Sequence, residues 1–175
     1  MFKLLHRGQD GGNIFYDKAG ELGEKEWDGI RLSDGGVKDN GESGSFESSW
    51  AIGHNRYATH GSDDSANFQP FRSGKWFYAH NGNLGTDTDI RRAKQHLHEL
   101  GVSFTGDSDS QVLGEMFRLA PYEKLEDKVR AAFHNTSGSA SFVAVDAVSG
   151  GRRAVAARKR GNRPLFKAEY DGGVV

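Results

Sequence analysis

Three helical patterns follow one another between residues 86 and 134, with strand-like runs before and after them. In the first pattern, the apolar residues Ile90, Ala93, Leu97 and Leu100 recur every three or four positions, which predicts an amphipathic helix. The second places Val112, Leu113, Met116 and Phe117 at the same spacing, and the third Leu125, Val129 and Phe133. Because helices and strands that come in separate blocks are typical of α+β domains, this order favours an α+β fold.

The ends of these helices are marked by residues with capping chemistry. Thr86 or Asp87 is suited to cap the first helix, and Gly101 follows its last apolar position as a natural stop. Ser108 and Gln111 have the spacing of a capping box at the start of the second helix. We expect the third helix over roughly residues 122–134.

Short aromatic or alternating runs predict the strands. These runs are Trp50–Ile52, Trp76–His80, Ser141–Asp146 and Arg153–Ala157. Ser149-Gly150-Gly151 predicts a hairpin between the last two. Residues 17–49 are rich in glycine and charge, so we expect loops there, with at most short strands around Ile30–Leu32.

Composition excludes several classes of protein. The 175 residues fit one domain, and 24 glycines, about twice the average of ~7%, indicate many turns and close backbone approaches. A net charge of −1 gives no field for general attraction to nucleic acid or membranes. The sequence has no run of 18 apolar residues, so a soluble, cytoplasmic protein is expected. With no cysteine, these residues hold no disulfide, no Cys-ligated zinc and no thiol nucleophile.

Four polar, glycine-containing clusters lie at the ends of predicted elements. They are His6–Asp10, Gly53–Gly61, His80–Asn83 and Gly106–Ser110. Each is compatible with an ordinary turn or helix cap, but four in one short chain favour a functional site, because a scaffold presents its functional side chains where strands end.

The chemistry of these clusters suits an α-amino acid and an acyl reaction. Arg56 could pair bidentately with a carboxylate, and Asp109 could pair with an ammonium group. Asn81 and the backbone N–H of Gly82 could form an oxyanion hole. The alternatives stay open: Arg56 in a structural ion pair, and Asp109 as a first-turn residue that suits the helix dipole.

The histidines do not predict a metal site. His54, His60 and His80 lie near strand ends, but no His-x-His or HExxH pattern and no carboxylate at ligand spacing accompanies them. His96 and His98 are expected on a helix surface.

Six motifs in order resemble the class II glutamine amidotransferase domain, the N-terminal-nucleophile glutaminase. They are LLHRGQD, GHNRYATHG, NFQPF, AHNGNL, GVSFTGDSDSQV and RGNRPLF, spread from about Leu4 to Phe166. HRGQD, NFQPF and NRPL are most similar to the amidophosphoribosyltransferase branch, whereas RYATHG is closer to glucosamine-6-phosphate synthase.

The resemblance implies a four-layer αββα sandwich of two antiparallel sheets, of the Ntn-hydrolase type. It also implies hydrolysis of glutamine to glutamate and ammonia without a cofactor, with ammonia passed to a synthase domain or subunit, in purine biosynthesis for this branch. A homo-oligomer is left open. The residues carried over are Arg56 and Thr59 for the α-carboxylate, Asp109 for the α-ammonium, Asn81 and Gly82 for the oxyanion hole, and Arg7 for the surroundings of the nucleophile.

The sequence departs from the family pattern at the nucleophile. The family uses an N-terminal cysteine whose α-amine acts as the base, whereas these residues contain no cysteine, and the thioether of Met1 cannot replace it. Gln111 stands where the family commonly has Glu. We therefore expect a single domain over residues 1–175 that is incomplete at both ends, lacks the first strand and has no glutaminase activity as it stands.

Two alternatives remain beside this interpretation. One is a non-catalytic relative that keeps the amino-acid pocket and serves in binding or regulation. The other is an unrelated binding domain in which the motifs are only turns.

Overall fold

The computed structural model describes residues 11–28, 32–33, 36–37, 48–56, 65–159, 161, 163–170 and 173–174. The helices are α1 (Asp87–Glu99), α2 (Asp109–Leu119) and α3 (Leu125–His134). The long strands are β1 (Gly11–Lys18), β2 (Glu21–Asp28), β5 (Ala51–Arg56), β7 (Trp76–Asn83), β8 (Ser139–Asp146) and β9 (Ala154–Arg158). The short strands are β3 (Leu32–Ser33), β4 (Gly36–Val37), β6 (Phe71–Ser73), β10 (Glu169–Tyr170) and β11 (Gly173–Val174).

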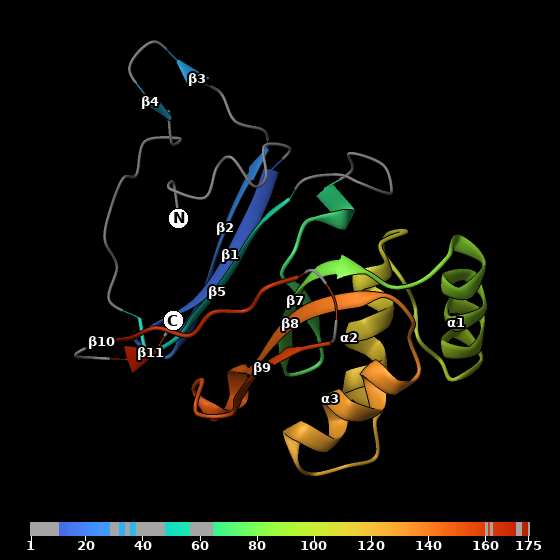
Figure 1. Cartoon of the computed structure of the whole chain (residues 1–175). Helices are drawn as coiled ribbons and strands as arrows, with labels where there is room; N and C mark the ends of the chain where they lie inside the picture. Colours follow the sequence, from blue (N-terminus) through green and yellow to red (C-terminus); the bar gives the residue numbers. More distant parts are fainter. Residues whose placement is uncertain are drawn as a thin grey trace.

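Two antiparallel sheets face each other, and helices cover one of them. The strand orders are β2-β1-β5 and β6-β7-β8-β9, while β3-β4 and β10-β11 form separate two-stranded ribbons. Figure 1 shows α2 and α3 on the side of the four-stranded sheet that faces away from β1, β2 and β5. The predicted α+β fold with two antiparallel sheets is confirmed. The described residues form three of the four predicted layers, and a helical layer outside β2-β1-β5 is not among them.

Strand β7 contributes to the core on both of its faces. Trp76 and Tyr78 are buried on the side of the helices, and Phe77 and Ala79 are buried on the side of the other sheet. This alternation follows from the two-residue period of a strand. On the helical side, the Phe117 ring of α2 lies 5.3 Å from the ring of Phe142 on β8, measured between centroids.

The two sheets are joined by a smaller apolar cluster. The Phe77 ring lies 4.6 Å from Phe15 on β1 and 5.7 Å from Trp50, which directly precedes β5. Ile52 on β5 belongs to the same cluster. The beginnings of β5 and β7 are therefore packed against each other.

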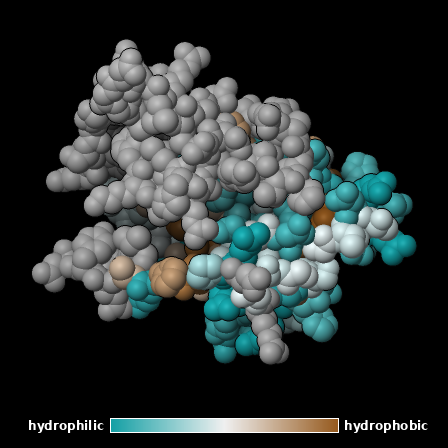
Figure 2. Space-filling view, turned by 45° about the horizontal axis from the view of Figure 1, so that its top comes forward, coloured by the Kyte–Doolittle hydropathy of each residue, from teal (hydrophilic) through white to brown (hydrophobic). Residues whose placement is uncertain are grey.

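The helix ends agree with the sequence only in part. Thr86 caps α1 in a full capping box with Asp89. Beyond the other end, Gly101 has a φ of 84°, a left-handed conformation that glycine adopts without strain. Figure 2 shows mainly hydrophilic side chains over α1 at the right, as expected for the outer side of an amphipathic helix. α3 begins at Leu125, three residues later than the predicted start.

The capping box predicted for α2 is wrong, although Ser108 is its N-cap. The Ser108 hydroxyl accepts a hydrogen bond from the Ser110 N–H at 3.2 Å. Gln111 does not reach back to the cap, because its side chain is used elsewhere. Its Oε1 accepts from the Gly106 N–H at 3.4 Å, and its Nε2 donates to the Ala66 carbonyl at 3.2 Å.

The expectation of loops over residues 17–49 is wrong at its beginning. β1 and β2, of eight residues each, form a hairpin in which Lys18 pairs with Glu21. Its two-residue turn places Ala19 and Gly20 at positive φ, of 54° and 91°, as a tight hairpin turn requires. Of the stretch around Ile30–Leu32, Leu32 opens β3, while Ile30 lies outside the described residues.

Candidate functional site

The predicted oxyanion residues lie within strand β7. Asn81 pairs with Ser141 of β8, and Gly82 pairs with Ala140. The alternative in which His80–Asn83 is a turn is therefore wrong. The same holds for the beginning of the Gly53–Gly61 cluster, because β5 continues to Arg56. Both strands continue beyond the apolar runs from which they were predicted.

Asp109 is the first residue of α2 and lies beside the end of β7. Its Oδ2 accepts a hydrogen bond of 3.0 Å from the N–H of Leu84, the residue that directly follows the strand. The carboxylate is half-buried and keeps further lone pairs for another donor. The structure thus holds the Asp109 carboxylate at Leu84, two residues after Gly82.

A buried polar network fixes this end of β7. The Nδ1 of His80 lies 3.0 Å from the hydroxyl of Ser110, and the backbone N–H of His80 donates to Gln69 Oε1 at 2.6 Å. Gln69 Nε2 in turn donates to Ser110 Oγ at 3.0 Å. The strand, the start of α2 and the segment before β6 are therefore held as one unit.

Burial of the His80 imidazole favours its neutral form. Burial lowers its pKa, the charge of Arg163 lowers it further, and the charge of Asp109 opposes both. Among the described residues, its Nε2 has no hydrogen-bond partner. A Cβ built on Gly82 would lie 2.6 Å from this nitrogen and would overlap the Ser139 carbonyl oxygen. Position 82 therefore requires glycine for reasons of space.

Two further segments of the predicted motifs reach this region. Asn67, from the NFQPF motif, donates to Asp107 at 2.7 Å and accepts from the Ser108 N–H at 3.1 Å, so it shapes the loop before α2. The Ser141 hydroxyl donates to the carbonyl oxygens of Arg163 and Pro164, at 2.9 and 3.1 Å. Because Ser141 pairs with Asn81, this bond brings the RGNRPLF motif to the site.

Arg56 is the last residue of β5, in the facing sheet. The beginnings of β5 and β7 are packed together, and in Figure 1 β5 runs from there toward the top of the view. The period of two puts position 56 on the same face of β5 as Ile52. The Arg56 side chain, Thr59 and Arg7 lie outside the described part of the structure.

Of the three histidines considered as metal ligands, the two in the described part of the structure lie on different strands and faces. His80 lies on the helical face of β7, whereas position 54 lies on the face of β5 that carries Ile52, and His60 is outside the described residues. Within the residues that the structure describes, no three histidine or acidic side chains group as metal ligands. His96 and His98 are exposed on α1, as predicted. No helix in the described ranges combines the length and apolar character needed to span a membrane.

The network of His80, Ser110 and Gln69 was not predicted from the sequence. One signal was present in the sequence: the period of a strand places His80 on the same face as Trp76 and Tyr78, and thus under a helix. The identity of its partners depends on how α2 crosses the sheet, which the spacing of residues does not reveal.

Comparisons with known proteins agree with these motifs. A family model described as "Glutamine amidotransferase domain" matches residues 54–175. The amidophosphoribosyltransferase of Bacillus subtilis strain 168 is 33% identical over 148 residues, covering 82% of this chain and 30% of that protein. The enzyme of Staphylococcus aureus strain COL is 31% identical over 149 residues, covering 81% and 28%. The chain thus spans less than a third of the length of these relatives.

Solved structures show the same similarity. The glutamine phosphoribosylpyrophosphate amidotransferase of B. subtilis, complexed with ADP and GMP, superimposes with a TM-score of 0.65 at 30% identity, covering 83% of this chain and 31% of that one. A structure described as the allosteric regulatory enzyme of purine biosynthesis gives 0.59 at 29% identity, covering 81% and 30%. The arrangement of two facing sheets and helices is the Ntn-hydrolase fold of that domain.

Proposed function

The chain belongs to the family of glutamine amidotransferase domains, and from this premise we propose that its residues form the glutamine-binding unit of a glutaminase. Glutamine would lie at the ends of β5 and β7, beside the first turn of α2. The reaction of the domain would be hydrolysis of the glutamine side-chain amide to glutamate and ammonia.

The observation that carries this proposal is the hydrogen bond between Asp109 and the N–H of Leu84, because Leu84 follows Asn81 and Gly82 at the end of β7. In the proposed complex, the α-ammonium group donates to the Asp109 carboxylate. The α-carboxylate lies on Arg56 and Thr59. Opposite charges at both ends of the zwitterion would select an α-amino acid, because charge-assisted hydrogen bonds are the strong ones.

The remaining groups would act on the side-chain amide. Asn81 and the N–H of Gly82 are proposed to donate to the oxygen that becomes negative when the amide carbon is attacked. The attacking group of such a reaction is a thiol, which forms an acyl intermediate and releases ammonia before water cleaves that intermediate. These 175 residues contain no cysteine, so the thiol would have to come from outside them, in the surroundings that Arg7 is proposed to shape.

The relatives suggest where the ammonia goes. They are amidophosphoribosyltransferases, and this chain covers only about 30% of the B. subtilis protein. We propose that ammonia would pass to a synthase domain or subunit of the same phosphoribosyl-transferring type, in purine biosynthesis. The absence of cysteine favours a second candidate, an amino-acid-binding or regulatory unit that uses the same pocket without chemistry.

Calorimetric titration of the chain with L-glutamine tests the shared part of both candidates. We expect saturable binding of L-glutamine and much weaker binding of D-glutamine, whose side-chain amide would point away from Asn81 and Gly82 once its α-ammonium and α-carboxylate lay on Asp109 and Arg56. Equal heats for the two enantiomers, or none, would contradict the assigned site.

Ammonia release then separates the two candidates. The chain itself is expected to release no ammonia above the level of the buffer. A fusion that places a cysteine-led segment ahead of Phe2 is expected to release it if the chain is a glutaminase unit. A folded fusion that binds glutamine without releasing ammonia would favour the binding or regulatory unit.

A further inference from the structure

A cationic cleft lies at the opposite end of β7 from the candidate glutamine site. Its volume is about 870 Å³, which is within the range of small-molecule sites. The lining residues come from the turn before β7, the end of α2, the start of α3 and the residue before β9. They are Gly74, Lys75, Trp76, Arg118, Tyr122, Glu123, Lys124, Lys128 and Arg153. Five of them are cationic and one is acidic.

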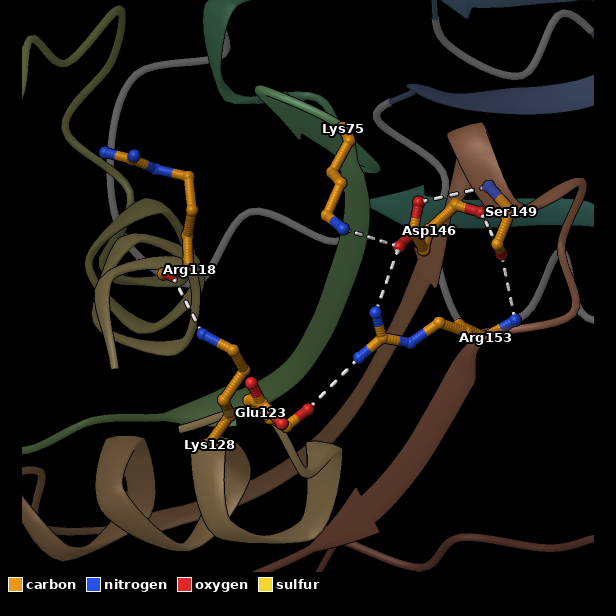
Figure 3. Close-up of polar contacts among 7 residues, drawn as sticks. All are labelled: Lys75, Arg118, Glu123, Lys128, Asp146, Ser149 and Arg153. Atoms are coloured by element: carbon orange, nitrogen blue, oxygen red, sulfur yellow. Dashed lines mark hydrogen bonds and ion pairs between the residues drawn. The ribbon is translucent and has the colours of Figure 1, made fainter. Parts of the chain in front are cut away.

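A single buried carboxylate orients two of the cations, as Figure 3 shows. Asp146 is 2% exposed, and its Oδ2 lies 2.9 Å from Lys75 Nζ and 4.0 Å from Arg153 Nη1. Arg153 also donates to the backbone carbonyl of Glu123 at 3.1 Å. These side chains are therefore held at the cleft before any ligand arrives, although Asp146 can neutralise only one of them.

Lys128 adds a third fixed cation. Its ammonium donates to the carbonyl oxygens of Arg118 and Ala120, at the C-terminal end of α2. Burial lowers the pKa of Lys128, and the charges of Lys75, Arg153 and Arg118 lower it further. The cations thus lie close enough to repel one another.

The structural roles of these residues do not account for the whole cleft. Lys75 and Arg153 pair with Asp146, and Lys128 donates to carbonyl oxygens at the end of α2. Arg118 pairs with Glu115 at 2.7 Å. Lys124 nevertheless remains exposed at the rim. Five cations against the three carboxylates of Glu115, Glu123 and Asp146 leave an excess of positive charge around a hollow.

We propose that this cationic cleft binds a small phosphate-bearing anion. Phosphoryl oxygens would accept from Lys75, Lys128 and Arg153, since Arg binds phosphate as a fork and Lys binds it as a point charge. The ring of Tyr122, which is 49% exposed, would contact an apolar part of the molecule. Because a strand rises about 3.3 Å per residue, the cleft lies about 20 Å from Gly82 and is separate from the glutamine site.

Calorimetric titration of the full chain with pyrophosphate tests this inference. We expect saturable binding with a Kd of about 1 mM or lower. Lys75→Gln should raise that Kd about tenfold, and Lys124→Gln about threefold, because each removes a cation facing the anion. The control Arg92→Gln removes an exposed cation on α1 and should change the Kd by less than about twofold.

The two binding proposals can be tested independently of each other. Asp109→Asn should leave pyrophosphate binding unchanged, whereas Lys75→Gln should leave glutamine binding unchanged. If Lys75→Gln fails to fold, Lys124→Gln carries the test, because its side chain makes no cap hydrogen bond.

Three results would overturn the inference. The first is a pyrophosphate titration without saturable heat, and the second is a loss of affinity in Arg92→Gln equal to that in Lys75→Gln. The third is a phosphoserine peptide that binds about tenfold more tightly than pyrophosphate. The last result would assign the cleft to a phosphorylated protein instead of a small anion.

Discussion

The two halves of strand β7 use one backbone for opposite purposes. Its first half, Trp76–Ala79, buries apolar side chains on both faces of the sheet. Its second half, His80–Asn83, is polar and carries the candidate oxyanion residues. The candidate site therefore gains its rigidity from the apolar half of the same strand, which directly precedes it.

The second half is also stabilised in another way. His80 is buried as deeply as the aromatic residues before it, but it is held by Ser110 and Gln69 instead of by apolar contacts. One of its ring nitrogens has no partner among the described residues. Such a group lowers stability, whereas the aromatic half raises it. Substitutions in the first half should therefore affect folding, and those in the second half ligand binding or pH dependence.

The largest effect is expected for Phe77→Ala. Phe77 is 1% exposed and contacts the rings of Phe15 and Trp50, so its truncation leaves a cavity between the two sheets. The free energy of unfolding should fall by about 3–5 kcal/mol in urea denaturation. The control Val148→Ala, at a side chain that is 81% exposed, should change it by less than about 0.5 kcal/mol. Similar losses in both variants would mean that this cluster does not join the sheets.

The next effect concerns ligand binding and not stability. Asp109→Asn keeps the shape of the side chain but removes its charge, so the Kd for L-glutamine should rise about 10- to 100-fold by calorimetry. The matched control Asp127→Asn removes a carboxylate that pairs with Arg130 on the surface of α3. It should leave the Kd unchanged within about twofold. An unchanged affinity in Asp109→Asn would remove Asp109 from the amino-acid site.

The same contrast explains how far sequence could predict this fold. The aromatic half of β7 and the three helices have clear apolar periods, and all of them were predicted. β2 was missed because its sequence, ELGEKEWD, is mostly charged and lies at one end of the three-stranded sheet. A strand of this kind carries no apolar alternation that would distinguish it from a loop.

The site was predictable as a set of residue types but not as a geometry. Asn81, Gly82 and Asp109 stood out by their chemistry and by resemblance, and the structure bonds Asp109 to Leu84, directly after β7. The bond from Leu84 to Asp109 and the network under His80 depend on which face of β7 meets α2. That contact is tertiary, so no spacing along the chain encodes it.

A smaller effect is expected from the pH dependence of stability. Because burial lowers the pKa of His80 in the folded state, the unfolded chain takes up the proton first, near pH 6.5. The free energy of unfolding should therefore fall as the pH drops below about 6.5, by up to about 1.4 kcal/mol per pH unit. Urea denaturation at several pH values between about 5 and 7 measures how the free energy of unfolding changes with pH.

Two variants assign this slope to one histidine. His80→Gln should reduce it, because the titrating group is lost while a polar side chain remains. His96→Gln, at an exposed position of α1, should leave it unchanged. A slope that persists fully in His80→Gln would show that another group carries the pH dependence.

The smallest effect on stability and on glutamine binding is expected for Asn81→Ala, although Asn81 is central to the proposed chemistry. Its side chain is exposed, so its loss should barely change stability. An oxyanion donor acts on charge that develops only after attack, so the Kd for glutamine should change by less than about twofold. In a cysteine-bearing fusion that releases ammonia, the same substitution should slow release by about 10²–10³-fold. If Asn81→Ala instead weakens glutamine binding as much as Asp109→Asn does, then Asn81 binds the ground-state substrate, and the polar half of β7 is a recognition surface and not an oxyanion hole.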